Sequence, residues 1–376
     1  MKKVTPLSHI ELSKKNLIHN IKQFRSLVKS GTKISVAIKG NAYGHGQNAV
    51  ARILEPHVDY FQVDSIEELA LLRKISQKKT FLFGYVQNTD LSKAVKLGCI
   101  LSIFSLEQLR ELDKVTRHLK KKQEIHIPFD AHLGREGFLL KELPKLLKEI
   151  KKCRYVKVSG IYAHFANIED TSNFIHAQKQ INEYRKALEL FCRENLETHI
   201  SASSGILVYE KGQGIHPIVR LGLSAYGMWP SKHLKFLYKN TRFTLRPVIA
   251  WKTKIAEIKI LPKGHTIGYG LTYITKKQTK TAVIPQGYAD GVDRGLSNKG
   301  EVLIHGARCK ILGRISMNMF TVDASHLPKV EIEDEVVILG RQKNEEITAE
   351  EIAKKLNTIN YEVTTRISSL LPRVVV

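Results

Sequence analysis

One lysine stands where its amine could act as a nucleophile. Lys39 follows the apolar segment 33–38, which predicts a buried strand, and precedes a turn at residues 40–46. We expect Lys39 to be the last residue of that strand, with the three glycines of the turn (Gly40, Gly44 and Gly46) clearing space around it. Burial favours the neutral, nucleophilic form of an amine, as an aldehyde cofactor requires. A lysine at a strand end can equally keep its charge in water, so spacing alone leaves both readings open.

Further polar side chains are expected at the ends of later strands. In a barrel of parallel strands, the active site forms at the carboxyl ends of the strands. Hydroxyls and open backbone N–H groups on neighbouring loops there suit a phosphate group. Each such residue alone is unremarkable, but together on one rim they favour a phosphorylated cofactor. The residues concerned are Lys39, Arg135, His164, Ser203, Ser204, Arg220 and Gly222.

The elements that must position these residues follow a regular alternation. Short apolar segments predict strands, and the segments between them have helical spacing or helix caps, such as Ser13 and the Ser65–Glu68 capping box. A long helix is expected at 173–193 and another from about Asn48. Eight such units predict a (β/α)8 barrel over residues 12–237. The expected strands are 33–39, 60–63, 80–83, 100–103, 124–130, 156–164, 199–203 and 218–221.

From residue 238 the pattern changes to alternating, strand-like segments with glycine turns. They are centred at 248–260, 281–284, 301–304, 309–312 and 336–339, and one helix is expected after Thr348, with Glu351 at the capping position. The sequence therefore predicts a second, mostly β domain at 238–376, which also takes in residues 1–11.

Composition narrows the class of protein. The chain has 376 residues and a formal net charge of +24, yet its basic residues are dispersed without interleaved aromatic side chains. We therefore expect a solvated surface that attracts anionic small molecules, and no nucleic-acid site. The cysteines Cys99, Cys153, Cys192 and Cys309 lie far apart, which argues against a disulfide framework or a metal site. Without a signal-peptide pattern at Met1–Leu12 or a membrane-spanning segment, we expect a cytoplasmic protein with no membrane partner.

Collinear motifs over nearly the whole chain resemble the alanine racemase family. The lysine motif is also similar to that of barrel-type decarboxylases, whereas the Gly-Tyr-Gly, Gly-Tyr-Ala-Asp-Gly and Gly-Arg-Ile-Ser-Met motifs are far more specific. The resemblance implies a homodimer in which each site is completed by the partner's β domain. The matching segments are Val36–Gly46, Gly134–Arg135, Ala163–Ala166, Val219–Gly227, Ile267–Gly270, Ile284–Gly291, Gly313–Met317 and Ile359–Val363.

The resemblance also implies roles for individual residues. Lys39 would hold pyridoxal 5'-phosphate covalently and exchange a proton with the substrate, and Tyr269 of the other subunit would act on the opposite face. A tyrosine needs cationic or hydrogen-bonding help to serve as a base at neutral pH, and His164 and Arg220 are the candidates. Arg135 and the Met317 N–H would bind the substrate carboxylate. The phosphate would contact Tyr43, Ser204, Gly222, Leu223 and Tyr361.

Arg220 has a further implication, because arginine donates hydrogen bonds and does not give up its proton. Facing the pyridine nitrogen, it would keep that nitrogen an unprotonated acceptor. Negative charge would then remain nearer the substrate Cα, which favours return of the proton there over transamination. The implied reaction is the interconversion of L- and D-alanine, which would supply D-alanine for peptidoglycan.

The chain departs from the family pattern at several positions. Pro128 stands where the family often has a lysine, sometimes carbamylated, so the support of Arg135 must differ. The usual Asp-Thr-Gly before Gly-Arg reads Asp130-Ala-His, and Asn318 follows Met317 where aspartate is usual. Ser203 and Gly40 replace a common asparagine and alanine. These changes bear on activity and substrate breadth more than on the class of reaction.

Three alternatives remain open from the sequence. One is a racemase of broader range that acts on serine or larger amino acids. Another is a barrel-type decarboxylase, against which the matches at Arg220 and Tyr269 argue. The third is a non-catalytic cofactor carrier or a basic nucleic-acid binder, against which the intact Lys39 and Tyr269 argue.

Overall fold

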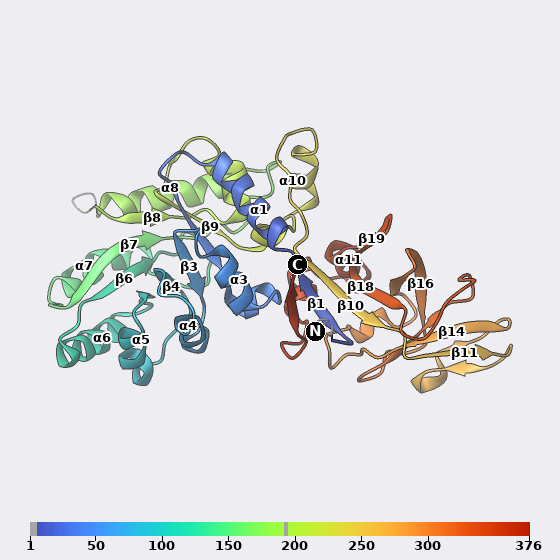
Figure 1. The fold of residues 1–376 in the computed structure, drawn as a ribbon. Helices are drawn as coiled ribbons and strands as arrows, with labels where there is room; N and C mark the ends of the chain where they lie inside the picture. The colour runs from blue at the N-terminus through green and yellow to red at the C-terminus, as the bar shows by residue number, and fades with distance from the viewer. Residues whose placement is uncertain (1–5, 192–194) are drawn as a thin grey trace. The chain divides into compact units, whose positions relative to one another are not determined.

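The chain forms two compact units in the computed structural model, which describes residues 6–191 and 195–376 (Figure 1). One unit contains residues 17–42 and 50–246. The other contains residues 1–16, 43–49 and 247–376. The chain therefore passes from the first unit to the second within the lysine motif and returns to the first at residue 50.

The first unit is a near-closed barrel of eight parallel strands, as predicted. The strands lie in the order β8-β7-β6-β5-β4-β3-β2-β9. Beyond the end of β8, the Arg220 N–H on β9 donates to the Ser201 carbonyl at 3.0 Å and joins the two edges. The strands are β2 (Lys33–Ala37), β3 (Tyr60–Val63), β4 (Thr80–Leu82), β5 (Ile100–Ser102), β6 (Gln123–Pro128), β7 (Val156–Tyr162), β8 (Glu197–His199) and β9 (Ile218–Leu221).

Helices follow the strands in sequence, as expected for βα units. Ser65 caps α4 by accepting from the Glu68 N–H at 3.2 Å, and α5 ends at Gly98, whose φ is 70°. The helix expected at 173–193 is α8, and its predicted end, together with Cys192, lies outside the described residues. The helices are α1 (Lys14–Leu27), α3 (Gln47–Leu54), α4 (Ile66–Arg73), α5 (Leu91–Leu97), α6 (Leu106–Leu119), α7 (Leu143–Ile150), α8 (Ile175–Glu189) and α10 (Lys232–Leu237).

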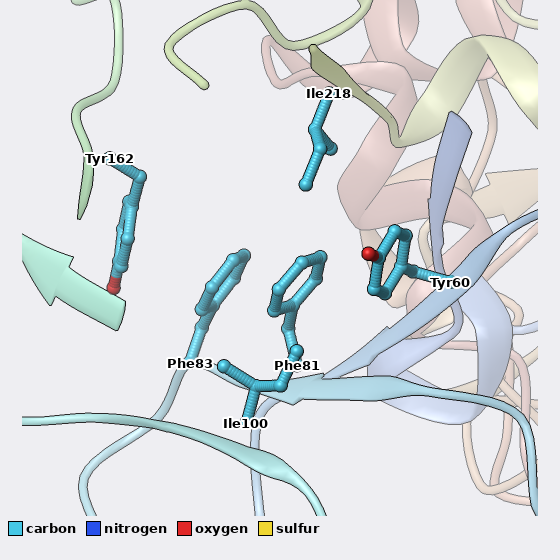
Figure 2. Close-up of a cluster of buried hydrophobic side chains, with 6 residues drawn as sticks. All are labelled: Tyr60, Phe81, Phe83, Ile100, Tyr162 and Ile218. Carbon is cyan, nitrogen blue, oxygen red and sulfur yellow. The ribbon is translucent and has the colours of Figure 1, made fainter. Parts of the chain in front are cut away.

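Aromatic side chains fill the barrel interior. Phe81 and Phe83 are two residues apart on and just after β4, so their rings point to the same side of the sheet. Tyr60 stacks on Phe81 at 4.8 Å between ring centroids, Phe81 on Phe83 at 5.1 Å, and Phe83 meets Tyr162 at 4.5 Å. Figure 2 shows this row of rings, and each of them is at least nine-tenths buried. The row therefore crosses the barrel interior from Tyr60, at the start of β3, to Tyr162, at the end of β7.

The second unit is built on a ten-stranded sheet, as the alternating segments predict. Its main path is β11-β14-β17-β16-β15-β18-β10-β1-β20, and β19 pairs with β18. The N-terminal strand β1 (His9–Leu12) joins this sheet between β10 (Ile249–Lys254) and β20 (Arg373–Val375). Met1–Thr5 lie outside the described residues. The remaining strands are β11 (Glu257–Leu261), β14 (Thr279–Ile284), β15 (Glu301–Ile304), β16 (Ala307–Leu312), β17 (Phe320–Asp323), β18 (Glu335–Gln342) and β19 (Glu345–Ile347).

Two short helices and a small hairpin complete the second unit. Thr348 caps α11 (Ala349–Leu356) by accepting from the Glu351 N–H at 3.1 Å, as predicted. The helix α12 (Asn360–Thr365) follows, and β12 (Thr266–Ile267) pairs with β13 (Tyr273–Ile274). Within residues 6–191 and 195–376, none of the helices combines the length and apolar character that crossing a membrane requires.

Candidate active site

Lys39 lies just beyond the first barrel strand. The prediction that it ends this strand is wrong by two residues, because β2 ends at Ala37 and Lys39 begins the turn α2 (Lys39–Tyr43). Its side chain is also less buried than expected, with 39% of its surface exposed. The ammonium donates to the Asp64 carboxylate at 3.3 Å. Asp64 follows β3, and the sequence analysis missed it because no motif marks it.

The turn after Lys39 is left-handed over four consecutive residues, 40–43, with φ between 54° and 58°. Outside glycine this conformation costs about 1–2 kcal/mol per residue. The Ala42 N–H donates to the Ile38 carbonyl at 2.8 Å, and the Gly40 N–H donates to the Glu68 carboxylate at 2.6 Å. The helix-capping glutamate of α4 thus also fixes the residue next to Lys39. A strained backbone conformation that the surrounding hydrogen bonds keep in place is typical of functional sites.

Gly44 and Gly46 were predicted to clear space around Lys39, and the structure gives them a different role. Gly44 and Gly46 clear space for residues of their own unit instead of for Lys39. A Cβ on Gly44 would lie 1.9 Å from the Thr364 carbonyl oxygen in α12, and one on Gly46 would lie 3.0 Å from the Arg373 side chain. Arg373 also donates to the Gly44 carbonyl at 2.7 Å.

Tyr43 and Tyr361, two predicted phosphate ligands, are neighbours in the second unit. Their ring centroids lie 6.1 Å apart. Tyr43 is the last residue of the left-handed turn, and Tyr361 lies on α12. The close packing of the glycine turn against α12 therefore brings these two hydroxyl-bearing rings together.

Arg220 is the most deeply enclosed cation of the barrel rim. It lies on β9 and is 6% exposed. One terminal nitrogen, Nη2, donates to the carbonyls of Ala163 at 2.6 Å and Ile200 at 2.9 Å. The guanidinium lies over the rings of Phe83 and Tyr162, at 5.6 and 5.4 Å from their centroids. Burial lowers the pKa of Arg220 to about 10, so the side chain remains charged at neutral pH.

His164 contacts Arg220 but is not itself cationic. It follows β7, which ends at Tyr162, so the expected strand is two residues too long. Its Nδ1 lies 3.4 Å from Arg220 Nη2. Burial, together with the charges of Arg220 and Arg135, lowers the pKa of His164 to about 3. Of the two residues expected to assist Tyr269, only Arg220 can therefore supply positive charge.

The predicted phosphate-binding residues of the barrel lie on adjacent loops. Strand β8 ends at His199, earlier than predicted, and Ser203 and Ser204 lie in the short helix α9 (Ser203–Gly205). The Gly222 N–H, after β9, donates to the Ser203 hydroxyl at 3.2 Å. Leu223 is buried at the start of the next turn. Ser203 thus joins the two loops, and Ser204 is its neighbour in α9.

Arg135 lies on the loop after β6, and its partner is the adjacent Glu136. Arg135 Nη2 donates to Glu136 Oε1 at 2.8 Å, and Arg135 Nε donates to Oε2 of the same carboxylate. This hydrogen-bonded pair raises the pKa of Arg135. The sequence analysis missed Glu136, although its place beside the arginine in Gly-Arg-Glu-Gly was a visible signal.

Tyr269 and Met317 lie on exposed loops of the second unit, which are packed against each other. Tyr269 is 73% and Met317 55% exposed. A Cβ on Gly268 or Gly270 would lie within 3 Å of Arg314, so the Gly-Tyr-Gly turn lies directly against the loop that leads to Met317. The Ala289 N–H, in the Gly-Tyr-Ala-Asp-Gly motif, donates to the Met317 carbonyl at 3.0 Å. Three motifs far apart in sequence therefore form one surface.

The barrel residues fit a pyridoxal-type cofactor. The Nε atom of Arg220 is buried and makes no hydrogen bond to any residue that the structure describes. A buried donor of this kind needs an acceptor, and an unprotonated ring nitrogen is one. The same rim carries the Lys39 amine, the Ser204 hydroxyl and the Arg135 guanidinium, which match an aldehyde, a phosphate and a carboxylate.

We expect the barrel to lose stability in acid. Burial lowers the pKa of His126 and His164 to about 3, of His216 to about 4, and of His199 well below 6.5. Between about pH 6.5 and 4 the unfolded chain therefore binds more protons than the folded chain, and stability falls as the pH falls. At pH 5 the loss should be roughly 2 kcal/mol for each histidine that stays neutral in the folded state.

Urea unfolding at pH 7.5 and at pH 5, followed by circular dichroism, measures this loss. Replacing His126 by glutamine should reduce the difference between the two pH values, whereas the same change at exposed His118 should not. Equal unfolding free energies at both pH values would contradict the prediction.

Comparison with known proteins agrees with these features. Residues 12–230 match the family model of the alanine racemase N-terminal domain, and residues 248–375 match that of the C-terminal domain. The alanine racemase of Leptospira interrogans serogroup Icterohaemorrhagiae is 35% identical over all of this chain and 97% of its own length. The solved alanine racemase of Clostridium difficile 630 superposes with a TM-score of 0.92 at 31% identity, covering 100% of this chain and 97% of that one.

A third protein carries the cofactor that the motifs imply. The alanine racemase from Bartonella henselae, solved with covalently bound pyridoxal phosphate, matches with a TM-score of 0.86 at 26% identity. The match covers 99% of this chain and 100% of that one. From the two domain models and these full-length matches, the chain belongs to the alanine racemase family.

Proposed function

We propose that this protein is a pyridoxal 5'-phosphate-dependent racemase that interconverts L- and D-alanine and so supplies D-alanine for peptidoglycan. The observation that carries the proposal is the grouping of Lys39, Arg135 and buried Arg220 at the carboxyl end of one barrel, within motifs shared by the family. The cofactor, when bound, draws electrons from the substrate Cα and makes its proton easier to remove.

The residues of this chain divide the remaining work. Lys39 holds the cofactor through Nζ and, when its amine is free, moves the Cα proton on one face of the substrate. Arg220 offers Nε–H to the ring nitrogen and keeps that nitrogen unprotonated. Arg135 binds the substrate carboxylate and the phenolate oxygen of the cofactor. The residues proposed to contact the phosphate are Tyr43, Ser204, Gly222, Leu223 and Tyr361.

We further propose that a second copy of the chain completes each site. Tyr269 would move the Cα proton on the opposite face, and the Met317 N–H would bind the carboxylate. Both residues lie among exposed large apolar side chains of the second unit, and a cluster of that kind is typical of a protein interface. The cluster includes Leu271, Ile274, Tyr288 and Met319.

A racemisation assay tests the proposed function. The protein with pyridoxal 5'-phosphate is incubated with L-alanine and, separately, with D-alanine, and the products are resolved by chiral chromatography. Both reactions should approach the same equal mixture, because the two enantiomers have equal free energy. Parallel reactions with serine measure substrate breadth. Release of carbon dioxide without the opposite enantiomer would show a decarboxylase and refute the proposal.

A further inference from the structure

The loop that carries Arg135 is closed tightly at its base. After β6, the Phe138 N–H donates to the Pro128 carbonyl at 2.9 Å, and the Asp130 N–H donates to the Phe138 carbonyl at 3.1 Å. Gly137 has φ of 117°, and a Cβ there would lie 2.7 Å from the Asp130 nitrogen. Pro128, the position that differs from the family pattern, thus anchors the loop through its backbone.

The side chain of Asp130 fixes the other half of the loop. Its carboxylate accepts from the N–H groups of Leu133 at 2.8 Å and Gly134 at 3.0 Å. Asp130 is thus bonded to the loop backbone, and among the described residues the ion pair of Arg135 is with Glu136 and not with Asp130. The backbone on both sides of Arg135 is therefore fixed, and the direction of its long side chain depends on another group.

That group is Glu136. It is the only carboxylate that forms an ion pair with Arg135 in the described part of the chain. The carboxylate takes two hydrogen bonds from one edge of the guanidinium, the edge formed by Nε and Nη2. The Glu136 side chain is 25% exposed, against 62% for Arg135. Glu136 is thus the more buried member of the pair.

The charge of Glu136 is kept although the residue is half-buried. Burial alone would raise the pKa of this carboxyl, but the hydrogen bonds and charge of Arg135 outweigh it and lower the pKa. The geometry therefore describes a charge-assisted, two-point ion pair, which is stronger and more directional than a neutral hydrogen bond. A guanidinium has five N–H donors. Two of them point at Glu136, and three remain at the Nη1 and Nη2 end.

We propose that Glu136 is a positioning residue that holds Arg135 by its Nε–Nη2 edge and directs its Nη1–Nη2 edge to the substrate carboxylate. The inference rests on the proposed function, because it assigns Arg135 to the carboxylate. It explains how the arginine is supported in a chain with Pro128 at the position where the family often has a lysine. The adjacent glutamate supplies the negative charge from within the same loop.

Replacing Glu136 by glutamine should raise the KM for L-alanine about tenfold and change kcat much less, because the lost contact orients a group that binds ground state and transition state alike. The inhibition constant of propionate, which has the carboxylate of alanine without its amine, should rise in parallel. Glu136→Asp keeps the charge and should restore most of the affinity. The control is Glu149→Gln, which removes a carboxylate of α7 that pairs with Lys152. It should change neither the KM for L-alanine nor the inhibition constant of propionate.

A chemical measurement tests the pair without relying on catalysis. Phenylglyoxal modifies arginine, and peptide mass spectrometry gives the rate at Arg135. The rate should rise in Glu136→Gln relative to the parent and to Glu149→Gln, and propionate should protect Arg135 in the parent. If the parent does not racemise alanine, the proposed function fails, but these rates still report whether Glu136 holds Arg135.

Two results would overturn the proposal. One is a folded Glu136→Gln protein with parent values for KM, for propionate inhibition and for Arg135 modification. The other is a lowered melting temperature with all three values unchanged, which would make Glu136 a purely structural residue of the loop.

Discussion

Lys39→Ala should reduce racemisation by about three orders of magnitude or more, because covalent capture of the cofactor and one proton transfer are lost together. Borohydride treatment of the parent protein should fix the cofactor irreversibly to the peptide that contains Lys39, and the variant should not retain it. The measurement is chiral analysis of the reaction together with mass spectrometry of the reduced protein. Lys157→Ala, at an exposed lysine of β7, is the matched control and should keep parent activity.

Two results would contradict the assignment of Lys39. The reduced cofactor could be found on a different lysine, or Lys39→Ala could retain parent activity with its cofactor still bound covalently. Either would move the covalent site away from the turn α2. Lys39→Ala should remain folded, because the Lys39 side chain is partly exposed and both members of its ion pair with Asp64 contact solvent.

The barrel could be predicted from sequence because short apolar runs, such as those in β3, β4, β5 and β9, alternate with segments that have helical spacing or helix caps. The β unit could be predicted because strands such as β10 and β17 alternate between buried and partly exposed residues. Strand ends were less accurate. In the sequence, apolar residues continue past the last hydrogen bond between neighbouring strands. The true strand ends therefore lie two to four residues before Lys39, His164 and Ser203.

The contacts around the site residues could not be predicted, because they join residues that no sequence spacing relates. Asp64 reaches Lys39 from the neighbouring strand, and Glu68 reaches Gly40 from a helix whose cap it also helps to form. Under Arg220, the ring of Phe83 comes from just after β4 and the ring of Tyr162 from β7, and these two strands are not adjacent in the sheet. Glu136 was the exception, since it lies next to Arg135 in the chain.

The electrostatic state of the site also required the structure. From sequence, His164 and Arg220 were both candidates to assist a tyrosine base. Burial beside two arginines removes the charge of His164, whereas Arg220 keeps its charge although it is buried more completely. The difference follows from their ordinary pKa values. Burial lowers the pKa of both side chains, but histidine starts near 6.5 and becomes neutral at pH 7, whereas arginine starts so high that it stays protonated. Arg220 is therefore the fixed positive charge of the barrel rim.

Mixing two nearly inactive variants should restore activity if the site is shared between subunits. We expect Lys39→Ala and Tyr269→Phe each to be nearly inactive alone. If they exchange subunits at random, about half of the dimers are heterodimers, and each heterodimer has one site with both lesions and one with neither. Activity should then recover to about a quarter of the parent value for a two-fold dimer with independent sites.

The measurement needs proof that subunits exchange. Differently tagged variants are mixed and passed over both affinity resins in turn, so that only heterodimers are assayed, and these should have about half of the parent activity. Lys39→Ala mixed with Lys39→Ala,Tyr269→Phe is the matched control and should recover nothing, since no combination of those chains provides an intact Lys39. If purified heterodimers of the single variants are inactive, Tyr269 serves Lys39 of its own chain or the two subunits share no site. Recovery would place the two proton-transferring residues on different subunits, and the exposure of Tyr269 in the isolated chain would follow from its place in the partner's site.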